Sequence, residues 1–339
     1  MIGRLKKPLI FGLLFISLVN VSGCSKKSYF ETYIERLERL LGERIQSPTK
    51  LTSVLLPRHI VADKKPSVTS IDLVDFLALS PCELQLIVAR RNSALGKVAL
   101  ESQNLINDVF FLNTAQQCLD RLGSQDTALR EKIREAILEK KSNLPNNVAR
   151  ATLGGPEYRE MWSRSVGDLF FDSEGIQALA YIRDKSENWL KGKYQIDGLE
   201  LEGNLSILRA SPLADYMGQV LRNNYYLSRL TILIGEEYRR GGFCRDGVST
   251  EKGVILKNIV ETYFAQASAK EINIATRGLS EFLVEIQKLN QLLSDVLSNE
   301  YKDFFSDQVS VLVHSKKILR EHTAVLEPVI FGCPSQPSY

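Results

Sequence analysis

The sequence predicts an all-α protein, a multi-helix bundle with an extended N-terminal strap. Apolar residues recur at steps of three and four over long segments, which is the period of amphipathic helices. Runs rich in β-branched residues are few, and a proline-bearing segment near the N-terminus has no sustained period. Long periodic segments joined by short breaks are typical of helix bundles, and we find no fixed repeat that indicates a solenoid.

Residues 1–23 have the pattern of a signal peptide. Arg4, Lys6 and Lys7 precede an apolar run from Leu9 to Val21, which gives a basic n-region followed by an h-region. The run is shorter than the roughly 20 apolar residues that a membrane-spanning helix needs. We therefore expect residues 1–23 to be removed from the mature chain.

The signal ends in Val-Ser-Gly-Cys, residues 21–24, which resembles the lipobox of bacterial lipoproteins. The resemblance implies that Cys24 is acylated, with palmitate among its acyl groups, and that three chains make a durable anchor where one is marginal. The alternative is a chance cysteine beside an uncleaved anchor. Ser25 stands where Asp would retain an enterobacterial lipoprotein at the inner membrane. We therefore expect a protein held by its N-terminal lipid on the periplasmic face of the bacterial outer membrane.

The mature chain has almost no net charge. The whole chain carries +3, and three positive charges leave with the signal peptide. A neutral chain creates no single-sign field, which argues against a nucleic-acid partner.

Residues 24–70 are expected to form an N-terminal helix and a proline-bearing strap or linker. The helix covers residues 28–45, with Phe30, Ile34 and Leu37 on one face and an end near Gly42. Residues 71–339 are expected to form the helical body, with a sub-lobe boundary near residues 191–204. That stretch contains glycines and a short apolar alternation, so we expect a hairpin or a loop there.

The body has a helical period almost throughout. We expect a break at residues 143–157, which contain prolines and a glycine pair, and a helix that starts with Ser173 as its N-cap. The loop RRGGFCRDG, residues 239–247, ends another helix. The expected helices cover residues 71–79, 82–91, 103–122, 127–142, 173–191, 213–238, 251–272, 279–296 and 306–323.

Four cysteines remain in addition to Cys24, and in an oxidising compartment they allow three pairings. We favour Cys82 with Cys118 and Cys244 with Cys333, because pairs that are near in sequence join local structure. The alternative is that one pair or both remain free thiols.

Catalytic and metal-binding motifs are not assembled, so we assign no catalytic residue, no metal ligand and no cofactor. Gly96-Lys97 lacks the first glycine and the Ser or Thr of a phosphate-binding loop. Ser47 to Lys50 satisfies Ser-x-x-Lys without the partner motifs of that enzyme class. His314 and His322 are expected to be exposed or to cap a helix end, and carboxylates such as Glu281 and Glu285 to be solvated.

One polar segment stands out as a candidate binding site: Arg90, Arg91, Asn92, Ser93 and Lys97 place three cations and two hydrogen-bonding side chains within eight residues. Arginines in such a cluster pair with carboxylate or phosphate groups, so the segment predicts an anion or peptide site. The alternative is a helix end, with Asn92 or Gly96 as a left-handed cap and the arginines near the last carbonyls. A Cys82–Cys118 disulfide would require the segment to be an ordered excursion.

A set of short motifs is concentrated in residues 72–105. They are FLALS (76–80), CELQ (82–85), RNS (91–93), LGKV (95–98) and SQ (102–103), and the lipobox and TLGGPEYREMW (152–162) add to them. Together they resemble the family of uncharacterised bacterial lipoproteins called domain of unknown function 3080. Ala94 and Lys97 stand where serine and arginine are more usual in that family. The resemblance implies coverage of nearly the whole mature chain and brings no activity with it.

Two functions are compatible with these observations. The first is a non-catalytic binding or scaffolding module that is tethered to the outer membrane and binds an envelope protein or an anionic ligand. The second is an enzyme that acts on peptidoglycan or lipid, with a cleft near residues 90–97. A deep polar cleft would favour the enzyme.

Overall fold

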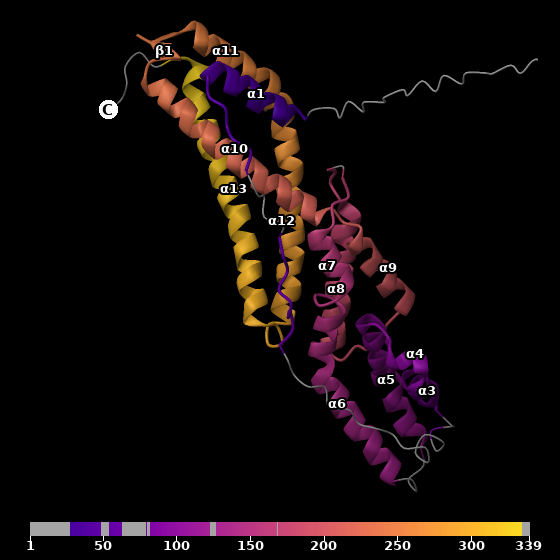
Figure 1. Cartoon of the computed structure of the whole chain (residues 1–339). Helices are drawn as coiled ribbons and strands as arrows, with labels where there is room; N and C mark the ends of the chain where they lie inside the picture. The colour runs from indigo at the N-terminus through magenta and orange to yellow at the C-terminus, as the bar shows by residue number, and fades with distance from the viewer. Residues whose placement is uncertain are drawn as a thin grey trace, which may run out of the picture.

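The computed structural model describes residues 28–48, 54–62, 79, 82–122, 127–167 and 169–333 (Figure 1). The fold is all-α apart from one short hairpin, as the sequence predicts. None of the helices in these ranges has a stretch long and apolar enough to span a membrane. The elements are α1 (Tyr29–Leu41), α3 (Leu84–Asn92), α4 (Ala94–Lys97), α5 (Glu101–Arg121), α6 (Thr127–Ala151), α7 (Pro156–Ser163), α8 (Ser173–Leu190), α9 (Gly198–Arg209), α10 (Leu213–Arg239), β1 (Cys244–Arg245), β2 (Val248–Ser249), α11 (Glu251–Ile259), the π-helix η1 (Val260–Ser268), α12 (Ala269–Leu292) and α13 (Asn299–Phe331).

Helix α1 is fixed at both ends. Ser28 and Glu31 form a reciprocal capping box, and Gly42 ends the helix in a left-handed conformation with φ of 73°. The carboxylate of Glu271 on α12 also accepts hydrogen bonds from the backbone N–H groups of Tyr29 and Phe30, at 3.1 and 3.2 Å. The start of α1 is therefore held against the body of the protein.

Within the strap that the sequence predicts, residues 54–62 are extended, and residues 49–53 and 63–70 lie outside the described residues. Val61 pairs with Leu297 in an antiparallel bridge beside the turn between α12 and α13. The backbone N–H of Ser298 donates to the carbonyl of Ile60 at 2.9 Å, and the Ile60 side chain is buried. Val54, Leu56 and Val61 also pack against the core, so residues 54–62 join the bundle through backbone hydrogen bonds and apolar contacts.

Two clusters of buried apolar residues share the long helices α10, α12 and α13. The larger cluster contains side chains from α3 to α9, and the smaller contains side chains from α1, α11 and η1. Figure 1 shows α1 and α11 at one end of an elongated molecule and α3, α4 and α5 at the other. Helix α8, which ends just before residues 191–204, and helix α9, which begins within them, both pack into the larger cluster, and the sub-lobe boundary there stays a prediction.

The expected break at residues 143–157 is wrong in its first half, because α6 continues through Pro145 to Ala151. Proline inside a helix costs about 3 kcal/mol. Leu144 and Val148 on the same turns are buried, and burial of one such side chain stabilises by about 1.5–3 kcal/mol. Burial of this face therefore outweighs the lost backbone hydrogen bond.

The hairpin or loop expected at residues 191–204 is confirmed as a loop over residues 191–197 and is wrong in its second half, since α9 begins at Gly198. The Asp197 side chain accepts hydrogen bonds from the N–H groups of Leu199 and Glu200 at 2.9 and 3.1 Å. Leu201, Leu205 and Leu208 follow at steps of four and three, and all three are buried. The helical period of these three leucines therefore determines that the segment is a helix, in spite of the short apolar alternation at its start.

Other element ends also differ from expectation. Asp172, and not Ser173, caps α8, since its side chain accepts from the N–H of Gly175 at 2.9 Å. The two helices expected over residues 251–296 form one run, α11, η1 and α12, and α13 is longer than expected at both ends. Asp246 and Gly247 both have positive φ, which lets the expected loop close as the β1–β2 hairpin.

Candidate functional site

The segment from Arg90 to Lys97 is an ordered helical step between α3 and α5. Ser93 ends α3 and begins α4: its hydroxyl donates to the carbonyl of Arg90 at 2.7 Å and accepts from the N–H of Gly96 at 3.0 Å. A Cβ atom on Gly96 would lie 2.3 Å from the Arg90 carbonyl oxygen. Glycine is needed here because two backbone segments approach closely.

The left-handed cap expected at Asn92 or Gly96 is wrong, because neither residue has a positive φ. Ser93 is the residue that ends α3, and its backbone is extended, with φ of −64° and ψ of 162°. An extended Ser at an N-cap satisfies a free N–H of the next helix through its side chain. The chain therefore steps directly from one helix into the next.

All five predicted binding residues are exposed. Arg91 donates to the side-chain oxygen of Asn104 at 2.6 Å. Within the part of the chain that the structure describes, neither Arg90 nor Lys97 has an ion-pair partner. The step therefore presents positive charge with which none of the described residues forms an ion pair.

Large apolar side chains that are close in sequence to these cations are exposed to solvent. Leu95 is 83% exposed and Val98 is 78% exposed, and Leu86 and Leu100 are exposed too. Exposed apolar groups gathered on one surface mark interaction sites more often than isolated ones do. We define the tip as the surface formed by Leu86, Arg90, Arg91, Leu95, Lys97, Val98 and Leu100.

A groove of about 480 Å³ adjoins the tip, between α5 and the start of α9. It is open to solvent, and α9 approaches α5 so closely that a Cβ on Gly198 would lie 3.2 Å from the Ile106 side chain. The amide of Gln103 donates to the carboxylate of Glu202 at 2.7 Å across the groove. The lining residues are Arg90, Gln103, Ile106, Phe110, Ile196, Asp197, Gly198, Leu199 and Glu202.

The sequence identified the side of this site that carries Arg90 and missed the side that α9 forms. Leu199 on that side is 87% exposed. The leucine spacing after Asp197 would have predicted a helix starting near Gly198, and hence an exposed first turn. Only the fold, however, brings residue 199 next to residue 103.

Both predicted disulfides are present, Cys82–Cys118 with a Cα–Cα distance of 5.4 Å and Cys244–Cys333 with 5.6 Å. The first joins the start of α3 to the end of α5, so it closes a loop that contains the whole tip. As expected if Cys82 and Cys118 are paired, the segment from Arg90 to Lys97 is ordered, and part of it forms α4. Cys24 lies outside the described residues, and its lipidation stays a prediction.

His322 was expected at the surface, and this expectation is wrong because the residue is fully buried. The Thr231 hydroxyl donates its only proton to the Leu227 carbonyl at 2.7 Å, so at 3.0 Å it accepts from Nδ1 of His322. Nε2 of His322 then accepts from the Tyr33 hydroxyl at 2.7 Å. Burial lowers the pKa of His322 to about 3, so the ring is neutral and joins α1 to α10 and α13. His314 is exposed, as expected.

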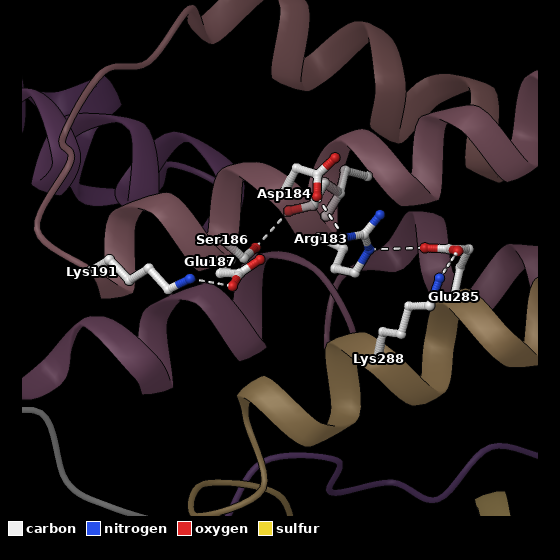
Figure 2. A network of polar contacts seen from close by, with 8 residues as sticks. Arg183, Asp184, Ser186, Glu187, Lys191, Glu285 and Lys288 are labelled. Carbon is white, nitrogen blue, oxygen red and sulfur yellow. Dashed lines mark hydrogen bonds and ion pairs between the residues drawn. The ribbon is translucent and has the colours of Figure 1, made fainter.

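Figure 2 shows a polar network that joins α8 to α12. Glu285, expected to be solvated, has a side chain only 12% exposed; Arg183 donates to it at 2.9 Å and Lys288 at 2.6 Å. Partial burial acts to raise the pKa of Glu285, but the hydrogen bonds from Lys288 and Arg183 outweigh it and hold the pKa below its usual value. Because every charge in this pairing has a partner, we interpret it as a structural link and not as a ligand site.

Metal-binding geometry is absent from the described ranges, where no three His, Cys, Asp or Glu side chains come together. A family model described as "Protein of unknown function (DUF3080)" matches residues 30–325. No curated protein and no solved structure matches the chain. The tip and the groove beside it are therefore the candidate binding site.

Proposed function

Because the chain belongs to the family described as Protein of unknown function (DUF3080), we propose a function from the site itself. The protein is a lipid-anchored periplasmic protein of the outer membrane, and it acts as a non-catalytic module that binds or scaffolds a partner. The tip and the groove are the binding surface.

One observation carries the proposal: a basic and apolar surface, continuous with a groove, lies at the end of the molecule remote from α1 (Figure 1). Helix α1 begins five residues after Cys24, and so short a segment spans at most about 18 Å. A lipid on Cys24 would hold the α1 end close to the membrane. The binding surface would then extend away from the membrane, where a partner can reach it.

Anchoring is tested by Cys24→Ala. We expect the variant to leave the membrane fraction, because the acyl chains provide the attachment. Ser25→Asp is the matched control, since it keeps the lipid and, by the sorting rule, moves the protein to the inner membrane. Sedimentation of Cys24→Ala with the membrane would overturn the lipid anchor.

Binding is tested by cross-linking the native-level protein in whole cells. In the variant, Arg90, Arg91, Asn92 and Lys97 are all changed to Ala, and captured proteins are identified by mass spectrometry. We expect a specific partner to be lost while the melting temperature stays close to that of the wild type. A control variant loses three exposed cations of α13 instead: Lys316, Lys317 and Arg320. If the tip variant keeps the same partners, the tip is not the binding surface.

The alternative is an enzyme that acts on peptidoglycan or lipid. No specific feature of the residues that the structure describes supports it. The carboxylates at the groove are Asp197 and Glu202. Asp197 accepts two N–H groups as the cap of α9, and Glu202 accepts from Gln103. Both carboxylates therefore have structural partners in place of a free reacting group.

A further inference from the structure

The face of α9 beside the groove is open enough to take another helix. Leu199, Gly203 and Ser206 lie on one face at steps of four and three, and all three are exposed. A Cβ atom on Gly203 would meet no atom within 4 Å. Glycine destabilises a helix relative to alanine, and packing within the chain does not require it here. The open space therefore suits close approach by a second chain.

Helix α5 forms the opposite side of the groove with the same helical spacing. Gln103, Ile106 and Phe110 follow one another at steps of three and four, and all line the groove. Two helices with apolar side chains between them form the kind of groove in which the apolar face of an amphipathic helix binds. Such a helix is recognised through residues at positions i, i+3, i+4 and i+7.

The two sides of the groove differ in charge. Arg90 lines one side, with Arg91 and Lys97 next to it on the tip, and Asp197 and Glu202 line the other. Acidic residues on the partner would be attracted to the first side and repelled by the second. An anionic membrane surface would meet the same repulsion and, being flat, would leave the groove unfilled. The charges favour a helix that carries its acids along one flank.

We propose that the tip and the groove bind an amphipathic helix of a partner protein, with its apolar stripe against Ile106, Phe110 and Leu199 and an acidic flank facing Arg90 and Lys97. The inference rests on the proposed function and adds the class of ligand and its orientation. Gly203 lets the partner backbone come close to α9.

The test places the photo-cross-linking residue benzoylphenylalanine at Leu199 of the full-length protein in cells. We expect an adduct whose partner peptide has apolar residues at steps of three and four and acids on one flank. Gly203→Leu should lower adduct yield by about tenfold or more, equivalent to 1.4 kcal/mol, because its side chain enters the space left for the partner. Gly218→Leu on α10 is the matched control, since a Cβ there also meets open space, and it should leave the yield unchanged.

Charge reversal tests the orientation. Arg90→Glu should lower the yield, and changing the acid nearest the cross-linked partner residue to lysine should restore it. Each variant must melt at or above the wild-type temperature, and Gly203→Leu is expected to do so because nothing occupies the space that it fills and leucine favours a helix more than glycine does.

The outcomes separate this inference from the proposed function. An adduct with the mass of a phospholipid, or with a peptide that lacks the apolar spacing and the acids, would overturn the helix proposal. The proposed function would then still be tested separately by the whole-cell cross-linking of the tip variant. Full yield in Gly203→Leu would also overturn it. Loss of all adducts, at Leu199 and with the cross-linker moved to Leu95, would count against both.

Discussion

The buried His322 should make the stability of the protein depend on pH in a defined window. Its pKa is about 3 in the folded protein and roughly 6.5 in an unfolded chain. The unfolded chain therefore binds a proton between these values that the folded protein does not bind. The stabilisation is fully present above pH 6.5 and is lost as the pH falls toward 3.

The size of the effect follows from this difference in pKa. Each pKa unit corresponds to about 1.4 kcal/mol, so the full loss approaches roughly 5 kcal/mol. Between pH 7 and pH 5 the expected loss is about 2 kcal/mol. Protonation of Nε2 also removes the acceptor of the Tyr33 hydroxyl, which leaves that buried proton without its partner.

The assay is urea unfolding at pH 7, 6 and 5, followed by circular dichroism. His322→Gln keeps a polar side chain that does not titrate, so its free energy of unfolding should fall by about 2 kcal/mol less than that of the wild type over this range. His314→Gln, on the same helix at an exposed position, is the matched control and should follow the wild type. Equal pH dependence in all three proteins would refute a neutral buried histidine.

Four further results are expected from urea unfolding. Changing both Cys82 and Cys118 to Ser should lower the free energy of unfolding by about 4 kcal/mol, from a sequence separation of 36. Gly175→Ala should lower it by about 1–3 kcal/mol, because a Cβ there would lie 2.8 Å from a ring carbon of Phe282, whereas Gly203→Ala should raise it by about 1 kcal/mol. Glu285→Gln should lower it by about 2 kcal/mol, since Arg183 and Lys288 both lose the partly buried carboxylate between them and Arg183 keeps only Asp184 among the described residues. A change below about 0.5 kcal/mol in any of the four would contradict the corresponding argument.

The sequence was sufficient to predict features that depend on local pattern. Helix α1 has its apolar residues, its cap and its terminal glycine within fifteen consecutive residues, so neighbouring residues alone determine it. The disulfides were predicted because pairs that are near in sequence join local structure. The strap was predicted from its prolines and its missing period.

Features that depend on which surfaces meet were not predicted. His322 lies on a helix whose own residues give no sign of Tyr33, 289 positions away. Burial of Glu285 likewise depends on Arg183, which α8 brings against α12. Spacing along one helix shows which residues share a face, but it does not show which other helix covers that face.

The α9 side of the groove was missed for a different reason. Residues 199–202 alternate apolar and polar side chains over a short distance, and that alternation outweighed the longer leucine period of the same segment. Had α9 been recognised, Leu199 would still have been expected to point away from the leucine face. The signal for a binding surface is therefore an apolar residue at the wrong position of an otherwise regular helix.

Two features of the tip indicate that it is a binding surface and not a segment that stabilises the fold. Leaving Leu95 in water forgoes about 1.5–3 kcal/mol relative to burying it, and the exposed Val98 adds to this. The same segment is nevertheless held in shape by the Cys82–Cys118 disulfide and by the Ser93 hydroxyl between two helices. A surface that is ordered before it meets a partner loses less conformational entropy on binding. Constraint and apolar exposure at one place are both explained if the tip is an interface.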